Sequence, residues 1–260
     1  MKDLKIAFFD SGMGGLSVLK RAVEMYPYER YIYYADTLNA PYGNLSKEKI
    51  YKHTKTSVEK LVKTGIKALV LACNTATNAA VSKLRQDFND FDIIGMEPAL
   101  KPAAEKISAG KILVLGTNAT LKQEKFKLLY NRYNDGNIIL SPQTNLAFDI
   151  ENNFFDQEFL LRKLELIFKD YKNLDIRGIV LGCTHYSLVK NLMRKMFENA
   201  EIFDGNEGTV INLFKKLRDK NLISLDREQS LEIVTSCNLK SKKEQYLKIL
   251  NILSNPIEKK

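Results

Sequence analysis

Cysteine and histidine are scarce in this chain, which has three cysteines and two histidines among 260 residues and no C-x-x-C pair. This scarcity argues against a disulfide framework and against a zinc cluster. No apolar run approaches the roughly 20 residues of a membrane-spanning helix, and residues 1–3 lead directly into a strand pattern without the features of a signal peptide. We therefore expect a cytoplasmic protein with free thiols, no membrane segment and no bound metal.

Strand patterns and helical patterns alternate along the chain, which predicts an α/β fold. Several strand patterns are near-continuous apolar runs, which are typical of parallel sheets covered on both faces. We expect strands near residues 4–9, 31–35, 67–72, 92–95, 111–115, 137–140, 177–181, 201–203 and 231–235. We expect helices near residues 13–26, 46–64, 75–88, 98–107, 118–132, 157–171, 186–198, 206–220 and 240–253, and loops at residues 134–136 and 152–156.

Strand–turn and strand–cysteine elements recur in the same order in the two halves of the chain. Asp10 precedes Cys73 by 63 positions (73 − 10), and Thr117 precedes Cys183 by 66 (183 − 117). We interpret this recurrence as an internal duplication. It predicts two similar α/β lobes with mainly parallel sheets, related by a pseudo-twofold axis, and an active site in the cleft between them. We expect the first lobe to comprise residues 1–97 and 210–260, and the second to comprise residues 98–209.

Two of the cysteines stand where a strand pattern stops and a helical pattern starts. Cys73 lies in residues 71–75 (LACNT), and Cys183 lies in residues 181–185 (LGCTH). Ligands bind beyond the carboxyl ends of the strands in parallel sheets, and a helix N-terminus favours the thiolate form of a cysteine. A single buried cysteine is usually inert packing, but two in matched positions predict a paired acid and base. Cys237 lacks this context, and we interpret it as structural.

Residues 10–15 (DSGMGG) follow a strand pattern and precede a helical one, a geometry that turns backbone N–H groups toward an anion. The Gly-x-Gly-x-x-Gly spacing of dinucleotide-binding turns is absent, and a carboxylate at Asp10 would repel a pyrophosphate. Asp10 beside Ser11 suits an ammonium group instead. A turn that merely requires glycine is the alternative.

Few other side chains of this sequence can exchange a proton near neutral pH. His185 directly follows Thr184 and is a candidate general acid near Cys183. Taken on the residues alone, Glu151 is expected to be an exposed carboxylate. His53 lies in a polar helical pattern, so a metal site would have to consist almost entirely of carboxylates, and no lysine motif for pyridoxal phosphate is visible.

Six blocks of the sequence together carry a family resemblance. They are residues 9–15 (FDSGMGG), 41–43 (PYG), 72–76 (ACNTA), 97–98 (EP), 116–120 (GTNAT) and 182–185 (GCTH). Over nearly its whole length the chain resembles the bacterial glutamate racemases of the cofactor-independent aspartate/glutamate racemase superfamily. It departs from them at Ala35, where glycine is common, and at Asn39, where arginine is frequent.

The resemblance implies an isomerase that interconverts L- and D-glutamate without a cofactor, with Cys73 and Cys183 as the two bases, and that supplies D-glutamate for peptidoglycan synthesis. It implies that Asp10, His185 and Glu151 assist the thiols. It implies that the amino and α-carboxylate groups of glutamate are bound by Asp10, Ser11, Asn74, Thr75, Thr117, Thr120, Thr184 and His185, and the side-chain carboxylate by the turn of Pro41, Tyr42 and Gly43. Homodimers are common in that family.

Three alternatives stay open at this point. Aspartate is a rival substrate, because one methylene changes discrimination by only about 1–3 kcal/mol, although the block at residues 41–43 favours glutamate. The net charge of +9 permits a nucleic-acid contact or a DNA gyrase interaction beside catalysis, but the sequence has no basic stripe interleaved with aromatic residues. We expect any nucleic-acid binding to be weak and salt-sensitive. A catalytically inactive binding protein would be expected to have lost one of the two cysteines.

Overall fold

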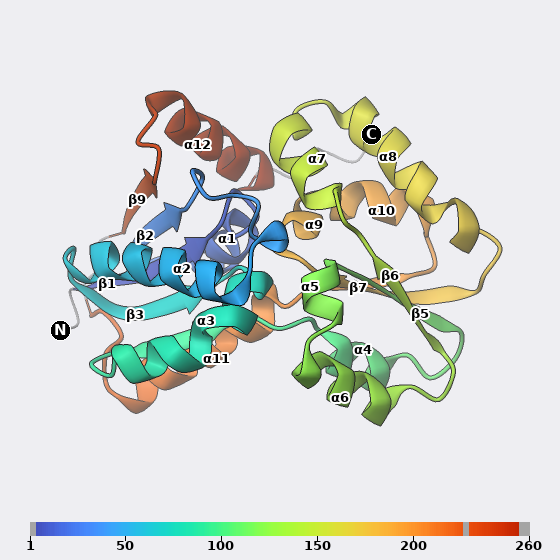
Figure 1. Cartoon of the computed structure of the whole chain (residues 1–260), viewed down its shortest axis with the longest axis horizontal. Helices are drawn as coiled ribbons and strands as arrows, with labels where there is room; N and C mark the ends of the chain where they lie inside the picture. Colours follow the sequence, from blue (N-terminus) through green and yellow to red (C-terminus); the bar gives the residue numbers. More distant parts are fainter. Residues whose placement is uncertain (1–3, 226–228, 255–260) are drawn as a thin grey trace. The chain divides into compact units, whose positions relative to one another are not determined.

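The computed structural model describes residues 4–225 and 229–254, which form two compact α/β units (Figure 1). One unit draws on Met1–Met96 and Asn206–Lys260, and the other on Glu97–Gly205. Residues 1–3, on which the signal-peptide expectation depends, lie outside the described residues. No helix within the described ranges is long and apolar enough to cross a membrane.

The first unit is built on a five-stranded sheet in the order β4-β3-β1-β2-β9, with every neighbouring pair parallel. The strands are β1 (Lys5–Asp10), β2 (Arg30–Ala35), β3 (Ile66–Leu71), β4 (Asp92–Gly95) and β9 (Ser230–Thr235). β3 is buried at all six positions, as its apolar run predicts for a strand covered on both faces. The last strand comes from the C-terminal part of the chain, so this unit is discontinuous in sequence.

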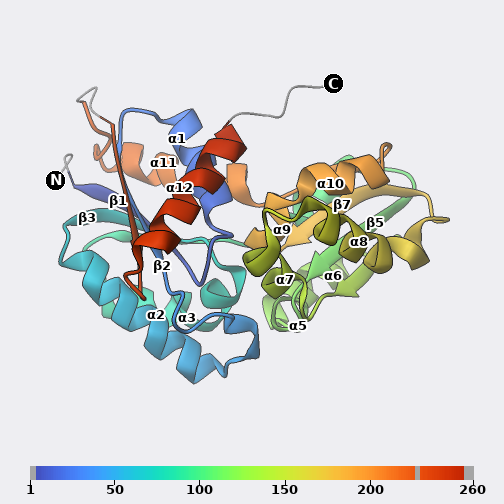
Figure 2. The same ribbon diagram turned by 90° about the horizontal axis from the view of Figure 1, so that it is seen from above.

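Helices cover both faces of this sheet, as Figure 2 shows. One face carries α1 (Leu16–Met25), α11 (Asn206–Asp219) and α12 (Lys240–Ser254), and the other carries α2 (Lys47–Val62) and α3 (Asn74–Asp87). A single 3-10 turn, η1 (Tyr42–Asn44), lies between β2 and α2. The arrangement is the doubly wound α/β fold expected from the alternating patterns.

The second unit has a four-stranded parallel sheet in the order β6-β5-β7-β8. Its strands are β5 (Lys111–Gly116), β6 (Ile138–Pro142), β7 (Ile176–Gly182) and β8 (Glu201–Phe203). Its helices are α4 (Leu100–Lys106), α5 (Asn118–Leu121), α6 (Glu124–Tyr133), α7 (Leu146–Asn153), α8 (Gln157–Phe168) with the 3-10 turn η2 (Lys169–Tyr171), α9 (Thr184–Leu188) and α10 (Lys190–Met196). Helices α4 and α6 lie on one face of the sheet and α8 and α10 on the other (Figure 1).

The two sheets repeat one topology, which supports the internal duplication. Read as β8-β7-β5-β6, the second sheet matches β4-β3-β1-β2 strand for strand. The central pair also breaks register at the same place in both sheets, directly after Lys5 and directly after Lys111. The offset from the start of β3 to the start of β7 is 110 residues (176 − 66), the same as from Cys73 to Cys183 (183 − 73).

The α/β class and the parallel sheets predicted from the sequence are confirmed, and each strand lies within two residues of its predicted position. Two predicted helices are wrong as continuous elements. The segment predicted at 118–132 is interrupted at residues 122–123, and the segment predicted at 186–198 is interrupted at Val189. The predicted helix at 13–26 starts later, at Leu16.

The prediction of a loop at residues 152–156 is wrong at its start, because α7 includes both Asn152 and Asn153. The side-chain amide of Asn152 donates to the carbonyl of Phe148 at 2.8 Å, and that of Asn153 donates to the carbonyl of Asp149 at 3.0 Å. These bonds reach back one helical turn, so two residues that usually favour loops instead extend the helix.

A buried ion pair joins the starts of β2 and β3 in the first sheet. Nζ of Lys67 lies 2.6 Å from Oε2 of Glu29, and both side chains are almost completely buried. Lys67 also donates to the carbonyl of Leu222 at 2.8 Å, and the backbone N–H of Ser224 donates to Glu29 at 2.9 Å. The pair therefore attaches the segment after α11 to β3 and to the residue that precedes β2.

We predict that Lys67→Met destabilises the protein by about 3–5 kcal/mol, because it leaves the Glu29 carboxylate buried without its partner. Lys106→Met is the matched control, since Lys106 pairs with Glu201 at the surface, where an ion pair contributes only about 0–1 kcal/mol. Urea unfolding of both variants measures the difference. Equal losses in the two variants would show that the buried pair does not stabilise this unit.

Candidate active site

The first half of the candidate site lies at the carboxyl ends of β1 and β3. These strands are parallel neighbours, with Phe9 opposite Leu71. The backbone N–H of Ala72 donates to the carbonyl of Phe9 at 2.9 Å, which extends the pairing past the end of β3. The residues that follow, Ser11 after β1 and Cys73 after β3, are thereby brought to the same edge of the sheet.

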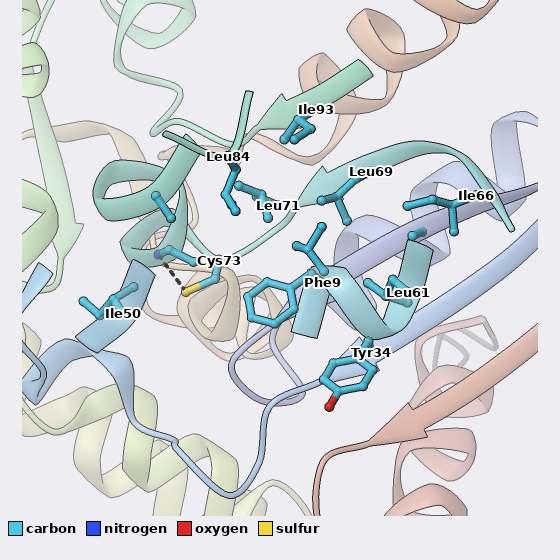
Figure 3. Close-up of a cluster of buried hydrophobic side chains, with 14 of the residues drawn as sticks. Phe9, Tyr34, Ile50, Leu61, Ile66, Leu69, Leu71, Cys73, Leu84 and Ile93 are labelled. Carbon is cyan, nitrogen blue, oxygen red and sulfur yellow. Dashed lines mark hydrogen bonds between the residues drawn. The ribbon is translucent and has the colours of Figure 1, made fainter. Parts of the chain in front are cut away.

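Cys73 is the N-cap of α3, and its sulfur accepts the backbone N–H of Ala76 at 3.4 Å (Figure 3). Oγ of Ser11 lies 3.7 Å from this sulfur and 3.5 Å from Oδ1 of Asp10. All three side chains are buried, and Asp10 also accepts the backbone N–H of Gly12 at 2.9 Å. A thiol, a hydroxyl and a carboxylate are thus placed in sequence, and the helix N-terminus favours the thiolate form.

The close approach behind Asp10 explains one glycine of this turn. A Cβ atom at Gly15 would lie 2.8 Å from Cβ of Asp10 and 3.0 Å from Cβ of Ala72. Any larger residue at this position would displace the Asp10 side chain. Gly15 is the N-cap of α1, which begins at Leu16. The sequence left open a turn that merely requires glycine, and this steric requirement applies at Gly15.

The side-chain amide of Asn74 is buried on the first turn of α3. It is 4% exposed, and among the described residues neither its Oδ1 nor its Nδ2 has a hydrogen-bond partner. A buried polar group without a partner costs free energy. A ligand that offers both a donor and an acceptor would satisfy Asn74, and the neighbouring Thr75, also buried, lies on the same first turn of α3.

The turn of Pro41, Tyr42 and Gly43 exposes its first and last residues and buries the middle one. The Tyr42 hydroxyl donates to Oδ2 of Asp36 at 2.6 Å. Burial and the neighbouring Asp36 carboxylate raise the pKa of Tyr42 above its ordinary value, so the hydroxyl keeps its proton. The Ala40–Pro41 peptide bond is cis.

The second half of the candidate site lies at the carboxyl ends of β5 and β7, where Gly116 is opposite Gly182. Cys183 follows β7 as the N-cap of α9. Its sulfur lies 3.8 Å from Nδ1 of His185, whose Nε2 lies 2.8 Å from Oε2 of Glu151. A thiol, an imidazole and a carboxylate therefore form a chain.

Glu151 is not the exposed carboxylate expected from the residues alone. Its side chain is only 15% exposed, because α7 directs it toward His185. The segment around Glu151 has no strand or helix pattern strong enough to have been predicted, and so this contact was not visible in the sequence.

Three threonines complete the second half-site. Thr117 is the N-cap of α5, where its Oγ1 accepts the N–H of Thr120 at 3.1 Å and lies 2.9 Å from the Thr120 hydroxyl. Thr120 and Thr184 are almost completely buried. A Cβ atom at Gly182 would lie 2.9 Å from the carbonyl oxygen of Leu115, so the backbone there has room only for glycine.

Asp36, a polar residue near the first half-site, was not singled out from the sequence. Asp36 directly follows β2, and Asp10 is the last residue of β1, so a carboxylate at the end of a strand pattern was the available signal. Ser187 is buried on α9, and within the described ranges its Oγ has no hydrogen-bond partner. Cys237 follows β9, and its sulfur accepts a hydrogen bond from Oγ1 of Thr37 at 3.2 Å. The described residues contain no group of three or more His, Cys, Asp or Glu that could hold a metal ion.

Comparison with known proteins decides the family. The model of the Asp/Glu/hydantoin racemase family matches residues 17–211. The chain belongs to this family. It is therefore an amino-acid racemase, an isomerase.

Relatives within the family are similar over nearly their full length. The glutamate racemase of Clostridium acetobutylicum is 44% identical over 230 residues, which cover 88% of this chain and 90% of the relative. Among solved structures, the glutamate racemase isoform RacE1 from Bacillus anthracis superposes with a TM-score of 0.85 at 28% identity, covering 96% of this chain and 95% of that one. The Escherichia coli glutamate racemase, in complex with L-glutamate and the activator UDP-MurNAc-Ala, gives a TM-score of 0.83 at 26% identity, covering 95% and 94%.

The charge state of His185 follows from its contacts. Burial lowers the pKa of His185, but its hydrogen bonds with Cys183 and Glu151 raise it more, so the pKa lies well above the ordinary value. Because the folded pKa exceeds the unfolded one, the protonated imidazole stabilises the fold fully below about pH 6.5. This contribution is lost as the pH rises through the folded pKa.

We predict that Glu151→Gln lowers the pKa of His185, because the amide carries no charge to favour the imidazolium. Proton NMR titration of the imidazole signals measures this directly, since the chain has only two histidines and His53 supplies the second signal. Glu158→Gln, which changes an exposed carboxylate paired with Arg162, is the matched control. An unchanged His185 titration in Glu151→Gln would mean that Glu151 does not set this pKa.

Proposed function

We propose that this racemase interconverts L- and D-glutamate by a two-base proton transfer between Cys73 and Cys183. The observation that carries the proposal is the match between the half-sites, in which each cysteine caps a helix and lies beside its own proton-transfer partners. The similarity to glutamate racemases, one of them bound to L-glutamate, supports this substrate.

The chemistry requires two groups, because racemisation removes a proton from one face of the α-carbon and adds one to the other. One cysteine as thiolate takes the α-proton, and the other as thiol donates a proton to the opposite face. The first sulfur ends protonated and the second ends as a thiolate, so no proton is gained or lost overall. Ser11 with Asp10, and His185 with Glu151, return the two sulfurs to their starting states.

The α-proton is very weakly acidic, so the site must stabilise the carbanion-like transition state. Hydrogen-bond donors aimed at the α-carboxylate serve this purpose, and we assign this role to Asn74, Thr75 and Thr184. Asp10 keeps the substrate amino group protonated. We assign the remaining contacts with the amino and carboxylate groups to Ser11, Thr117, Thr120 and His185.

The mechanism requires that the two cysteines reach one substrate. We propose that residues 1–97 with 210–260 and residues 98–209 act as the two lobes of a single active site, and that the reaction needs no cofactor. The turn of Pro41, Tyr42 and Gly43 receives the side-chain carboxylate. The presence of this turn favours glutamate over aspartate as the substrate.

Within the cell, we propose that the enzyme acts in the cytoplasm as a homodimer and supplies D-glutamate for peptidoglycan synthesis. This assignment follows from the family resemblance. Assembly of cell-wall precursors and cell shape would then depend on its activity.

Replacing either catalytic cysteine tests the two-base proposal. Cys73→Ser and Cys183→Ser are each expected to lower racemisation in both directions by about 10²-fold or more, because each thiol is the base in one direction and the acid in the other. Cys237→Ser, the matched control, is expected to keep wild-type activity. Circular dichroism of L- and D-glutamate solutions follows the reaction.

The two serine variants should still differ with a substrate that needs no reprotonation. β-Chloroalanine loses chloride after deprotonation, and the resulting aminoacrylate hydrolyses to pyruvate and ammonium. The family resemblance implies that Cys73 deprotonates the D-isomer and Cys183 the L-isomer. Cys73→Ser should therefore convert only the L-isomer and Cys183→Ser only the D-isomer. If both variants produced pyruvate equally from the same isomer, the assignment of one cysteine to each face would be wrong.

A separate measurement tests the cofactor-independent chemistry. Protein dialysed against a chelator and treated with hydroxylamine, which removes pyridoxal phosphate, should racemise glutamate at the untreated rate. A loss of turnover that added metal or pyridoxal phosphate restores would contradict the proposal.

A further inference from the structure

The segment between β2 and α2 carries the turn proposed to bind the side-chain carboxylate, and beyond Asp36 its residues are mostly exposed or half-buried. Leu38 is 68% exposed, and Pro41 and Gly43 are exposed as well. Tyr42 is the exception at 1% exposed, with its ring 6.2 Å from that of Phe9 in the core. Tyr42 is therefore the side chain that ties the turn to the first unit.

The partner of Tyr42 is a buried carboxylate at the edge of the sheet. Asp36 is 2% exposed, and its backbone N–H donates to the carbonyl of Asp10 at 2.9 Å. This bond places Asp36 one strand away from the residue that assists Cys73. The position of Asp36 is therefore set by its pairing with β1.

The Asp36 carboxylate accepts hydrogen bonds from two other side chains of this segment. Oδ2 of Asp36 accepts the Tyr42 hydroxyl at 2.6 Å, while Nδ2 of Asn39 donates to Oδ1 at 3.0 Å and to Oδ2 at 2.9 Å. Residues 37–41 thus form a loop held at its base by Asp36 and Tyr42 and braced at its middle by Asn39. Hydrogen bonds to a charged acceptor are among the stronger ones in proteins.

We infer that Asp36 is a positioning residue for substrate recognition, which holds the turn of residues 41–43 at a fixed distance from Cys73 through the Tyr42 hydroxyl. This inference rests on the proposed function, because it assumes that the turn receives the side-chain carboxylate of glutamate. Asp36 itself touches no reacting atom. Its loss weakens the binding of glutamate while the proton-transfer groups stay in place, since these groups are held by β1, β3 and α3 in one half-site and by β7, α7 and α9 in the other.

Hydrogen exchange tests the clamp without using the reaction. In ligand-free protein, Tyr42→Phe, Asp36→Ala and Asn39→Ala should each speed amide exchange in a peptide covering residues 37–45. Tyr31→Phe is the matched control, because Tyr31 is equally buried and donates its hydroxyl to the carbonyl of Tyr26 at 2.6 Å. Unchanged exchange in Tyr42→Phe would overturn the inference.

Steady-state kinetics test the consequence for substrate. Tyr42→Phe should raise KM for glutamate about tenfold, which corresponds to about 1.4 kcal/mol, with kcat unchanged within about twofold, the pattern of lost ground-state binding. Asp36→Ala should behave alike, and the double variant should be no worse than the single ones. Tyr31→Phe should keep the wild-type KM.

The two proposals fail in different ways. Faster exchange with an unchanged KM would overturn the role of Asp36 in recognition and leave the racemase assignment standing. A fall in kcat with KM constant would likewise overturn it, because it would place Asp36 in the chemistry. Wild-type protein that does not racemise glutamate would remove the proposed function, and the substrate role of Asp36 with it, whatever the exchange result.

Discussion

Parallel pairing at the centre of each sheet is the constraint on which both half-sites depend. β1 and β3 end together because Phe9 is paired with Leu71, and β5 and β7 end together because Gly116 is paired with Gly182. A parallel ladder fixes which residues leave the sheet side by side, and a shift of one residue would turn every side chain to the other face. The backbone therefore brings Cys73 to the edge where Asp10 and Ser11 lie, and Cys183 to the edge where Thr117 lies, before any side-chain packing is considered.

The two half-sites share one fold but place different chemical groups beside their cysteines. Cys73 lies beside a hydroxyl and a carboxylate, whereas Cys183 lies beside an imidazole and a carboxylate. Cys73 is also the more buried of the two. The duplication thus supplied two equivalent places for a thiol, and the residues around each place have since diverged. Under the proposed two-base mechanism, the two directions of proton transfer need not share the same pH dependence.

The strands and the cysteine turns could be predicted from the sequence because both depend on local pattern. Apolar runs marked the strand ends to within two residues, and the recurrence of cysteine after such runs identified the candidate bases. Glu151 could not be placed, because its position depends on α7, whose Asn152 and Asn153 would ordinarily signal a loop. The clamp at Asp36 consists of side-chain hydrogen bonds to Asn39 and Tyr42 within one irregular segment, for which the sequence carries no periodic signal. The roles of the individual site residues remain predictions.

The strand β9 completes the first sheet from the far side of the chain. It pairs with β2 along its whole length, and beyond its end Oγ of Ser236 accepts the backbone N–H of Leu38 at 2.9 Å in the loop that Asp36 holds. On the ribosome, all of the residues 97–205 emerge before β9 does. The unit whose synthesis begins first is therefore completed last. Until β9 has been synthesised, the edge of β2 and the loop of residues 37–41 lack the hydrogen bonds that β9 and Ser236 provide.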